Sequence, residues 1–296
     1  MDTDGASDDA AALLLAAGSP DLAAVTVCGG VVDVDQAVHN ALVILAVAER
    51  PDVPVHRGAP RSLTGRPFPA AEDVHGPGGL GGHDFEPPPR GPDPRPASDV
   101  LADGLAGDAT ILTLGPLTNV ATALARSGHA GRGRLVCMAG AQDAVGNVTA
   151  VAEYNVFCDP ESAAAVLGSG LDITLVGWDV SRRDAVIGDD ELARIRAVGT
   201  RRAEFLARAN SSLDRFCRHV QGLAGYDLPD AAAAAVALDP DVVTASARLP
   251  VAVELAGRLT RGMTVVDHRS GSDPNTTVVW SIDHRRFVDL LVAALA

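Results

Sequence analysis

This sequence of 296 residues contains no lysine. All 24 of its basic residues are arginine. Acidic residues number 38, which gives a formal net charge of −14. Nucleic acids and anionic membrane surfaces bind clusters of positive charge, so this balance argues against both as partners. An acidic chain of this kind is compatible with a site that binds a cation.

Aromatic residues are also scarce, at 3% of the chain, although hydrophobic residues make up 47%. The core is therefore expected to consist mainly of alanine, valine and leucine. The four cysteines are widely spaced and form no CxxC pair, which argues against a zinc site and a disulfide framework. No signal or transit segment and no long uncharged apolar run is recognisable, so we expect a protein of the reducing cytoplasm.

Apolar runs of strand length alternate with helical stretches along most of the chain. The runs are continuously hydrophobic, which is typical of strands buried on both faces of a parallel sheet. We predict one α/β domain over residues 1–296, with a mostly parallel central sheet, flanking helices and a ligand site at the carboxyl ends of the strands. Strands are predicted at 24–28, 53–56, 109–114, 135–139, 173–180, 251–255, 263–267 and 276–282, and helices at 36–49, 117–126, 162–168, 189–220 and from 285.

Two segments interrupt this alternation. Residues 62–98 are dense in glycine and proline and are expected to form a long surface loop. Loops of this length inside a compact domain are usually functional or disordered. Residues 221–230, with the sequence QGLAGYDLPD, are expected to be a second flexible segment.

The opening sequence MDTDGASDD places four carboxylates within eight positions. Asp2 and Asp4 stand two apart at a strand end and would point the same way. Asp8 and Asp9 begin a helix, where exposed N–H groups favour negative charge. Helix capping explains one of these residues but not all four, and converging carboxylates repel one another unless a cation neutralises them. The motif predicts a site for a hard cation, Ca²⁺ or Mg²⁺. Almost no strand precedes it, so either a very short strand suffices or the true start lies upstream of Met1.

This opening resembles the DxDPGxDD signature of the inosine–uridine-preferring nucleoside hydrolase family, with Gly5-Ala6 where Pro-Gly is usual. Further segments that resemble the family follow along the chain in the family's order, and together they are more specific than any one of them alone. The resemblance implies a Rossmann-like nucleoside hydrolase fold and Ca²⁺-dependent hydrolysis of the bond between the base and the ribose of a ribonucleoside. The other matching segments are VDQAVHNALVIL, VHGPGGLGG, LTLGPLTNVATAL, GNVTAVAEYNVFCDPESA, LVGWDV and DAAAAAVALDP.

The resemblance also implies roles for the metal-binding residues. Calcium would be held by the side chains of Asp4, Asp9 and Asp230 and by the backbone carbonyl of Thr118, and the 2′- and 3′-hydroxyls of ribose would complete its shell. The metal would orient the sugar and acidify a bound water. Asp4 would be the general base that takes the proton of this water. Asp8 would accept a hydrogen bond from a ribose hydroxyl.

A second group of residues is implied to bind the sugar. By the resemblance, Asn147, Glu153 and Asn155 bind ribose hydroxyls, including the 5′-hydroxyl. Such contacts suit the chemistry, because glycosidic cleavage passes through an oxocarbenium-like state that polar groups around the sugar can stabilise. Glu153 and Asn155 are two apart in a strand-like run, so both are expected to face one way. His75 matches a family histidine near the substrate, with a solvated loop histidine as the alternative.

The half of the site that would bind the base departs from the family pattern. Many members carry a histidine before the late aspartate as the acid for the leaving base, but Pro229 stands there and cannot donate a proton. Trp178 is a candidate to stack on the base, with a buried core tryptophan as the alternative. Tyr226 and His219 are candidate donors, and Val31 replaces an asparagine of the family. The preferred base and the leaving-group acid stay open.

Two other functions also stay open. The start DTDG resembles that of haloacid-dehalogenase-type phosphatases, in which Asp2 would be a nucleophile and Mg²⁺ the metal, but that family ordinarily needs a lysine. The second possible function is that of a ribose- or nucleoside-binding protein without catalysis. It stays open because Pro229 and Val31 stand where the family has polar side chains. A small-molecule ribonucleoside is the expected partner, and the resemblance implies a homodimer or homotetramer.

Overall fold

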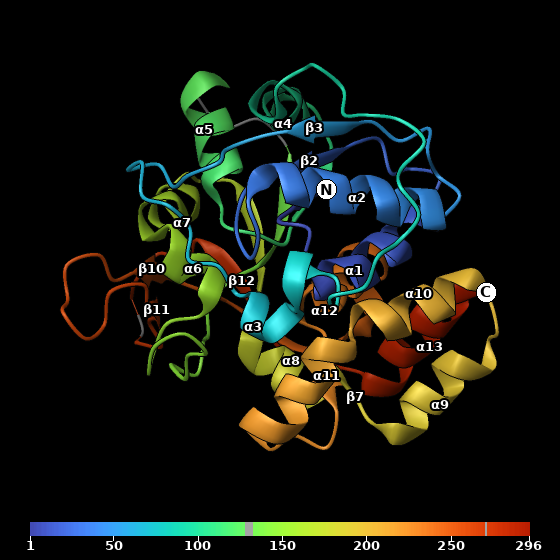
Figure 1. Cartoon of the computed structure of the whole chain (residues 1–296). Helices are drawn as coiled ribbons and strands as arrows, with labels where there is room; N and C mark the ends of the chain where they lie inside the picture. The colour runs from blue at the N-terminus through green and yellow to red at the C-terminus, as the bar shows by residue number, and fades with distance from the viewer. Residues whose placement is uncertain (128–132, 270) are drawn as a thin grey trace.

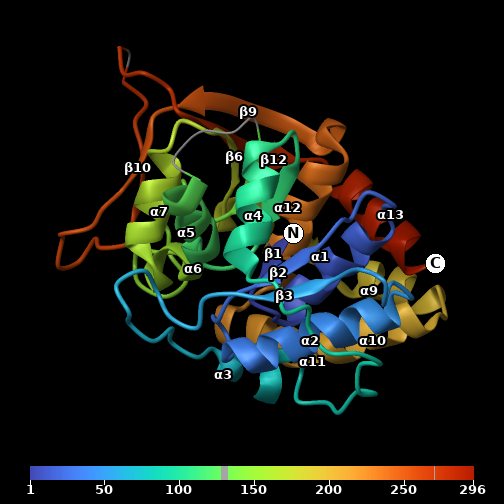
Figure 2. The same cartoon turned by 90° about the horizontal axis from the view of Figure 1, so that it is seen from above.

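The computed structural model describes residues 1–127, 133–269 and 271–296 and has a central sheet of eight strands. Neighbouring strands run parallel, except for the antiparallel pair at one edge. Helices cover both faces of the sheet (Figure 1, Figure 2), so the predicted fold class is confirmed. The strand order is β3 (Val55–Arg57), β2 (Val25–Val27), β1 (Asp2–Thr3), β4 (Thr110–Thr113), β5 (Arg134–Met138), β6 (Asp172–Val176), β12 (Thr276–Ile282) and β9 (Val243–Leu249).

Two short two-stranded sheets accompany the central one: β7 (Val186–Ile187) pairs with β8 (Tyr226–Asp227), and β10 (Val251–Val253) pairs with β11 (Thr264–Val266). No helix in the described ranges is long and apolar enough to cross a membrane. The α-helices are α1 (Ser7–Ala17), α2 (Val34–Val47), α3 (Glu72–His75), α4 (Ala97–Ala106), α5 (Thr118–Ser127), α6 (Tyr154–Cys158), α7 (Pro160–Leu167), α8 (Trp178–Asp184), α9 (Asp189–Ala197), α10 (Arg201–Ala209), α11 (Ser211–Phe216), α12 (Pro229–Leu238) and α13 (His284–Leu295).

The hydrophobic core consists of two layers, one on each face of the sheet. Successive side chains of a strand point to opposite faces. In β5, Leu135 and Cys137 pack with α4, α5 and α7, whereas Val136 and Met138 pack with the layer that contains α1, α2, α12 and α13. Both faces of β5 are therefore buried, which explains why its sequence is continuously hydrophobic.

Alanines allow α1 and α12 to lie against each other, as Figure 1 shows. Ala10, Ala11 and Ala12 of α1 are fully buried, and so is the run of five alanines at 231–235 in α12. Because alanine has only a methyl group, the two backbones can approach closely. This contact brings the start of α12 close to the start of α1.

The structure differs from the sequence prediction in several segments. The strand predicted over 173–180 ends at Val176, since α8 begins at Trp178. Residues 62–98, expected to be a loop, contain the short helix α3. Strand β9 was not predicted, because it lies at the edge of the sheet, is largely exposed and lacks an apolar run. Residues 153–155 are not a strand, because Glu153 caps α6. The two residues of β1 suffice to pair with β2 and β4.

Candidate active site

A cavity of about 310 Å³ lies at the carboxyl ends of the parallel strands. The connections that follow β1, β2, β4, β5 and β6 reach the same edge of the sheet, because parallel strands all end there. Ligand binding at this edge was the prediction from the alternating pattern. The lining residues from or just after these strands are Asp4, Val31, Leu114, Met138 and Trp178.

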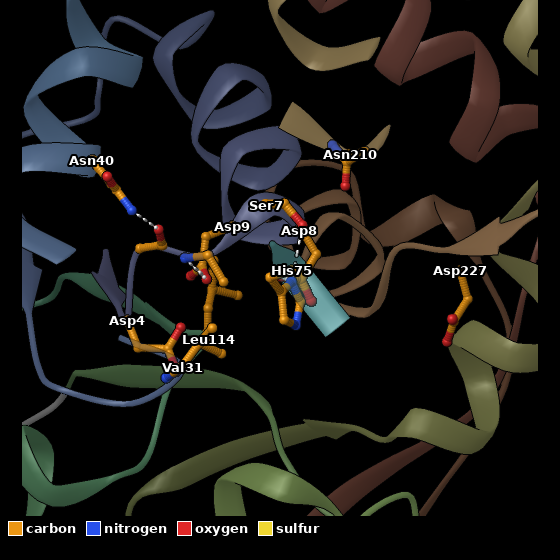
Figure 3. Close-up of polar contacts among 12 residues, drawn as sticks. Asp4, Ser7, Asp8, Asp9, Val31, Asn40, His75, Leu114, Asn210 and Asp227 are labelled. Carbon is orange, nitrogen blue, oxygen red and sulfur yellow. Dashed lines mark hydrogen bonds and ion pairs between the residues drawn. The ribbon is translucent and has the colours of Figure 1, made fainter. Parts of the chain in front are cut away.

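Carboxylates gather at one end of this cavity. Asp8, Asp9 and Asp230 each place one oxygen within 4.8 Å of the others, and Asp4 stands next to Asp9. The carboxylate of Asp9 accepts hydrogen bonds from the Thr3 hydroxyl and, at 2.8 Å, from the Ala6 N–H. Figure 3 shows Asp4 and Asp9 close together beside the start of α1. Asp4 and Asp230, which stand 226 positions apart in the sequence, thus share one site, because α12 packs against α1.

These carboxylates are buried without a cationic partner. Burial, followed by the charges of neighbouring aspartates, raises the pKa of Asp4 and of Asp230 well above the usual range. Burial also raises the pKa of Asp8 to about 6 and that of Asp9 above its ordinary value. Among the described residues, no arginine forms an ion pair with any of the four. A group of buried, mutually repelling carboxylates is the arrangement that a bound cation stabilises.

A glycine close to Asp4 leaves room for its carboxylate. The Oδ2 of Asp4 accepts a hydrogen bond of 3.2 Å from the N–H of Val31. A Cβ atom at Gly30 would stand 2.0 Å from this oxygen, which no contact between non-bonded atoms allows. The side chain of Asp4 therefore depends on Gly30 for its position.

Gly30→Ala is accordingly expected to displace Asp4 and to lower kcat by roughly 100-fold, as misplacement of a catalytic group by about 1 Å can do. Gly29→Ala is the matched control, because its Cβ would meet the Phe68 ring at 3.0 Å and the Pro60 carbonyl at 3.4 Å, and no atom of Asp4. Steady-state rates and melting temperatures of both variants provide the measurement. Equal rates for the two variants would contradict the dependence of Asp4 on Gly30.

The predicted sugar-binding residues also line the cavity. Glu153 is buried and accepts N–H bonds from Gly140 at 2.7 Å and from Asn155 at 2.8 Å. Burial raises the pKa of Glu153 to about 7, although these N–H groups favour its charged form. The Asn155 amide donates to the carbonyl of Leu114 at 2.7 Å. Asn147 is exposed at the mouth of the cavity.

The carbonyl predicted as a metal ligand was placed on the wrong residue. Thr118 begins α5, where its carbonyl accepts a hydrogen bond of 2.8 Å from the Thr122 hydroxyl and points along the helix. Its own hydroxyl donates to Asp159 at 2.6 Å, and Thr118 does not line the cavity. Leu114, the first residue after β4, lines the cavity instead. Its carbonyl accepts the Asn155 amide bond at 2.7 Å and keeps a second lone pair for a further partner at this edge.

His75 lies in the cavity, as the sequence suggested. Its Nδ1 is 2.9 Å from the Ser7 hydroxyl and 3.5 Å from a carboxylate oxygen of Asp8 (Figure 3). Burial lowers the pKa of His75 to about 4. The imidazole is therefore neutral near pH 7 and does not neutralise the acidic cluster.

At the other end of the cavity, the predicted donors Tyr226 and His219 do not line the wall. Tyr226 is fully buried in β8, and His219 is exposed on a π-helical turn over residues 217–221. Adjacent strand residues point to opposite sides, so Tyr226 enters the core while Asp227 lines the cavity. Trp178 lines the cavity too, and its indole N–H donates to Asp227 at 3.0 Å. Sequence analysis missed Asp227, since no motif marks it.

Comparisons with known proteins agree with this geometry. The model of the inosine-uridine preferring nucleoside hydrolase family matches residues 1–289. The pyrimidine-specific ribonucleoside hydrolase RihA of Shewanella sp. (strain MR-4) is 39% identical, over 100% of this chain and 95% of the relative. RihA of Salmonella enteritidis PT4 is 37% identical, over 100% and 97%.

Solved structures point the same way. The purine-preferring ribonucleoside hydrolase from Gardnerella vaginalis superposes with a TM-score of 0.92 at 30% identity, over 99% of this chain and 96% of that one. The plant nucleoside hydrolase PpNRh1 superposes with a TM-score of 0.91 at 30% identity, over 99% and 97%. The chain therefore belongs to the inosine-uridine preferring nucleoside hydrolase family and is an enzyme of the ribonucleoside hydrolase class.

Proposed function

We propose that this enzyme hydrolyses the N-glycosidic bond of a ribonucleoside to the free base and ribose, with Ca²⁺ held by the acidic cluster. The observation that carries the proposal is the convergence of four aspartates, three of them buried and Asp8 half-buried, without an arginine partner in the described residues, at one end of a cavity. Glu153 and Asn155 line the same cavity, where they can bind the hydroxyls of a sugar.

The donor atoms fit a hard cation. Asp4, Asp9 and Asp230 would hold the metal together with the carbonyl of Leu114, which lines the same cavity. All of these donors are oxygens, which Ca²⁺ prefers, and neither a thiolate nor a charged imidazole takes part. When bound, Ca²⁺ supplies a positive charge that orients the ribose hydroxyls and makes a water molecule more acidic.

The residues of the chain then perform the proton transfer and hold the sugar. Asp4 takes the proton of the attacking water as general base, and the Val31 N–H fixes its orientation. Asp8 accepts a hydrogen bond from a ribose hydroxyl. Glu153, Asn155 and Asn147 hold the rest of the sugar, and such contacts accelerate cleavage when they are stronger in the oxocarbenium-like transition state.

Family membership argues against the alternatives that the sequence left open. A phosphatase with Asp2 as nucleophile is incompatible with the structure, because Asp2 does not line the cavity. Its carboxylate accepts hydrogen bonds from Thr26 at 2.6 Å and from Asn119 at 2.9 Å. A binding protein without catalysis would hold a nucleoside in the same cavity, so only the products distinguish it from an enzyme.

The test is the release of free ribose from a panel of purine and pyrimidine ribonucleosides. Both classes are needed, because the relatives are named pyrimidine-specific in one case and purine-preferring in the other. We expect ribose and the free base in equal amounts from at least one member. If a nucleoside bound to the protein in calorimetry and no member yielded ribose, the hydrolase proposal would be wrong and a binding protein would be favoured.

We infer that residues 1–296 fold as one domain, because both core layers pack on the same sheet. The homodimer or homotetramer that the family resemblance implies stays a prediction, and so does the cytoplasmic location. The four cysteines are buried and free, which is compatible with a reducing compartment.

A further inference from the structure

Asp227 is a buried carboxylate in the cavity that the proposed reaction does not use. It ends β8, is 4% exposed and lines the wall at the end away from the acidic cluster. Figure 3 shows it far from Asp4, with His75 and Asp8 between them. All of these residues line one cavity, so a base attached to a ribose held at Asp4 and Asp8 can lie against Asp227.

The two oxygens of Asp227 have different partners. Oδ2 accepts the indole N–H of Trp178 at 3.0 Å and lies 2.9 Å from the Ser181 hydroxyl. In the part of the chain that the structure describes, the side-chain donor to Oδ1 is the thiol of Cys217, at 3.7 Å, and a thiol is a weak donor. One oxygen is thus anchored to the wall, and the other keeps most of its capacity to accept a hydrogen bond.

The surroundings favour Asp227 as an acceptor. An indole N–H can only donate, so Oδ2 must accept from Trp178. Among the described residues, Asp227 forms no ion pair with an arginine or a histidine. Burying a carboxylate without a full set of donors is costly, and a donor on the ligand would complete the set at Oδ1.

We propose that Asp227 recognises the base of the substrate, with Oδ1 accepting a hydrogen bond from a ring N–H of that base. The inference rests on the proposed hydrolysis and adds the substrate class to it. Uracil (N3–H) and hypoxanthine (N1–H) carry such a donor, whereas their N-methylated forms lack it. Arg182 lies over the Trp178 ring, 4.5 Å from its centre, and holds Asp143 at 2.6 Å. These contacts keep Trp178, and through it Asp227, in a fixed orientation.

The first test compares matched substrates on the parent enzyme. We expect uridine to exceed 3-methyluridine, or inosine to exceed 1-methylinosine, by at least about 100-fold in kcat/KM, since a site built for an N–H rejects an analogue without it. Equal values within each pair would overturn the assignment while leaving the hydrolase function intact. No ribose from these four substrates, with ribose released from another ribonucleoside of the panel, would overturn this inference alone. No ribose from any member of the panel would overturn the hydrolysis itself and this inference with it.

The second test replaces the acceptor without changing its volume. In the Asp227→Asn variant, the amide oxygen can keep the Trp178 bond while the NH₂ group takes the place of Oδ1. The preference for the unmethylated substrate is expected to fall below about 10-fold, because the NH₂ group of the new asparagine would then face the ring N–H of the base, and both are donors. Asp190→Asn, at an exposed position of α9, is the matched control and should keep the parent ratio.

The ratio between two substrates separates recognition from structure. A merely structural role of Asp227 would slow both members of a pair equally and leave their ratio unchanged. A folded Asp227→Asn variant that retained the parent ratio would overturn the proposal. If this variant did not fold, the substrate pairs on the parent enzyme would still decide.

Discussion

Asp4→Asn is expected to lower kcat for ribose release by about 10³-fold, within the range that a general base contributes. The substitution keeps the size of the side chain, and an amide oxygen can still accept the Val31 N–H bond that holds Asp4 in place. An amide cannot take the proton of the attacking water. It also weakens one ligand of the proposed calcium site, so calorimetric Ca²⁺ affinity must be measured on the same variant.

Stability distinguishes this loss from unfolding. Burial and the charge of Asp9 raise the pKa of Asp4, which means that its ionised form is disfavoured in the metal-free protein. Removing that charge should leave the melting temperature without metal unchanged or higher. Asp190→Asn serves as the control, because Asp190 is exposed and does not line the cavity. An Asp4→Asn variant that hydrolyses nucleosides as fast as the parent would show that another group is the base.

Removal of calcium is expected to stop ribose release and to lower the melting temperature. A ligand at 100 times its Kd stabilises the folded state by about 2.7 kcal/mol. For a chain of 296 residues, this corresponds to a shift of roughly 4 °C, because the entropy of unfolding is about 2.1 cal/mol/K per residue. The physical reason is that four buried or half-buried carboxylates repel one another until a cation binds among them. Differential scanning calorimetry and ribose release, before and after chelation, provide the two measurements.

Metal identity follows from adding ions back to the chelated enzyme. Ca²⁺ should restore more activity than Mg²⁺, because Mg²⁺ requires a stricter octahedral geometry and gives up its waters reluctantly. Asp230→Asn should remove most of the thermal response to Ca²⁺, whereas Asp190→Asn should retain it. Unchanged activity and an unchanged melting temperature after chelation would refute the calcium site.

The leaving base presents the main mechanistic difference from the family pattern. Pro229 cannot protonate the leaving base. His75 is a neutral imidazole near pH 7 rather than an imidazolium acid, because burial lowers its pKa to about 4. Asp227 and Trp178 are the polar groups that the structure places at this end of the cavity. A rate that depends strongly on the pKa of the leaving base would accordingly indicate that the base departs without a strong acid from the protein.

Features that depend on local sequence were predicted correctly. Continuous apolar runs such as 135–139 indicated a parallel sheet buried on both faces. The acidic motif around Asp4 and Asp9 indicated that carboxylates converge, and the structure places them in one cavity, whereas the cation that they would hold stays a proposal. Strand periodicity and charge repulsion act between near neighbours, so the sequence alone reveals them.

Only the tertiary structure decided which atoms reach the cavity. The carbonyl at the edge of the sheet belongs to Leu114 rather than Thr118, because the end of β4 and the start of α5 determine where each carbonyl points. Asp227 lines the cavity and Tyr226 does not, because pairing of β8 with β7 sets which side each residue faces. Such orientations depend on packing between distant segments, and a shift of one residue reverses them.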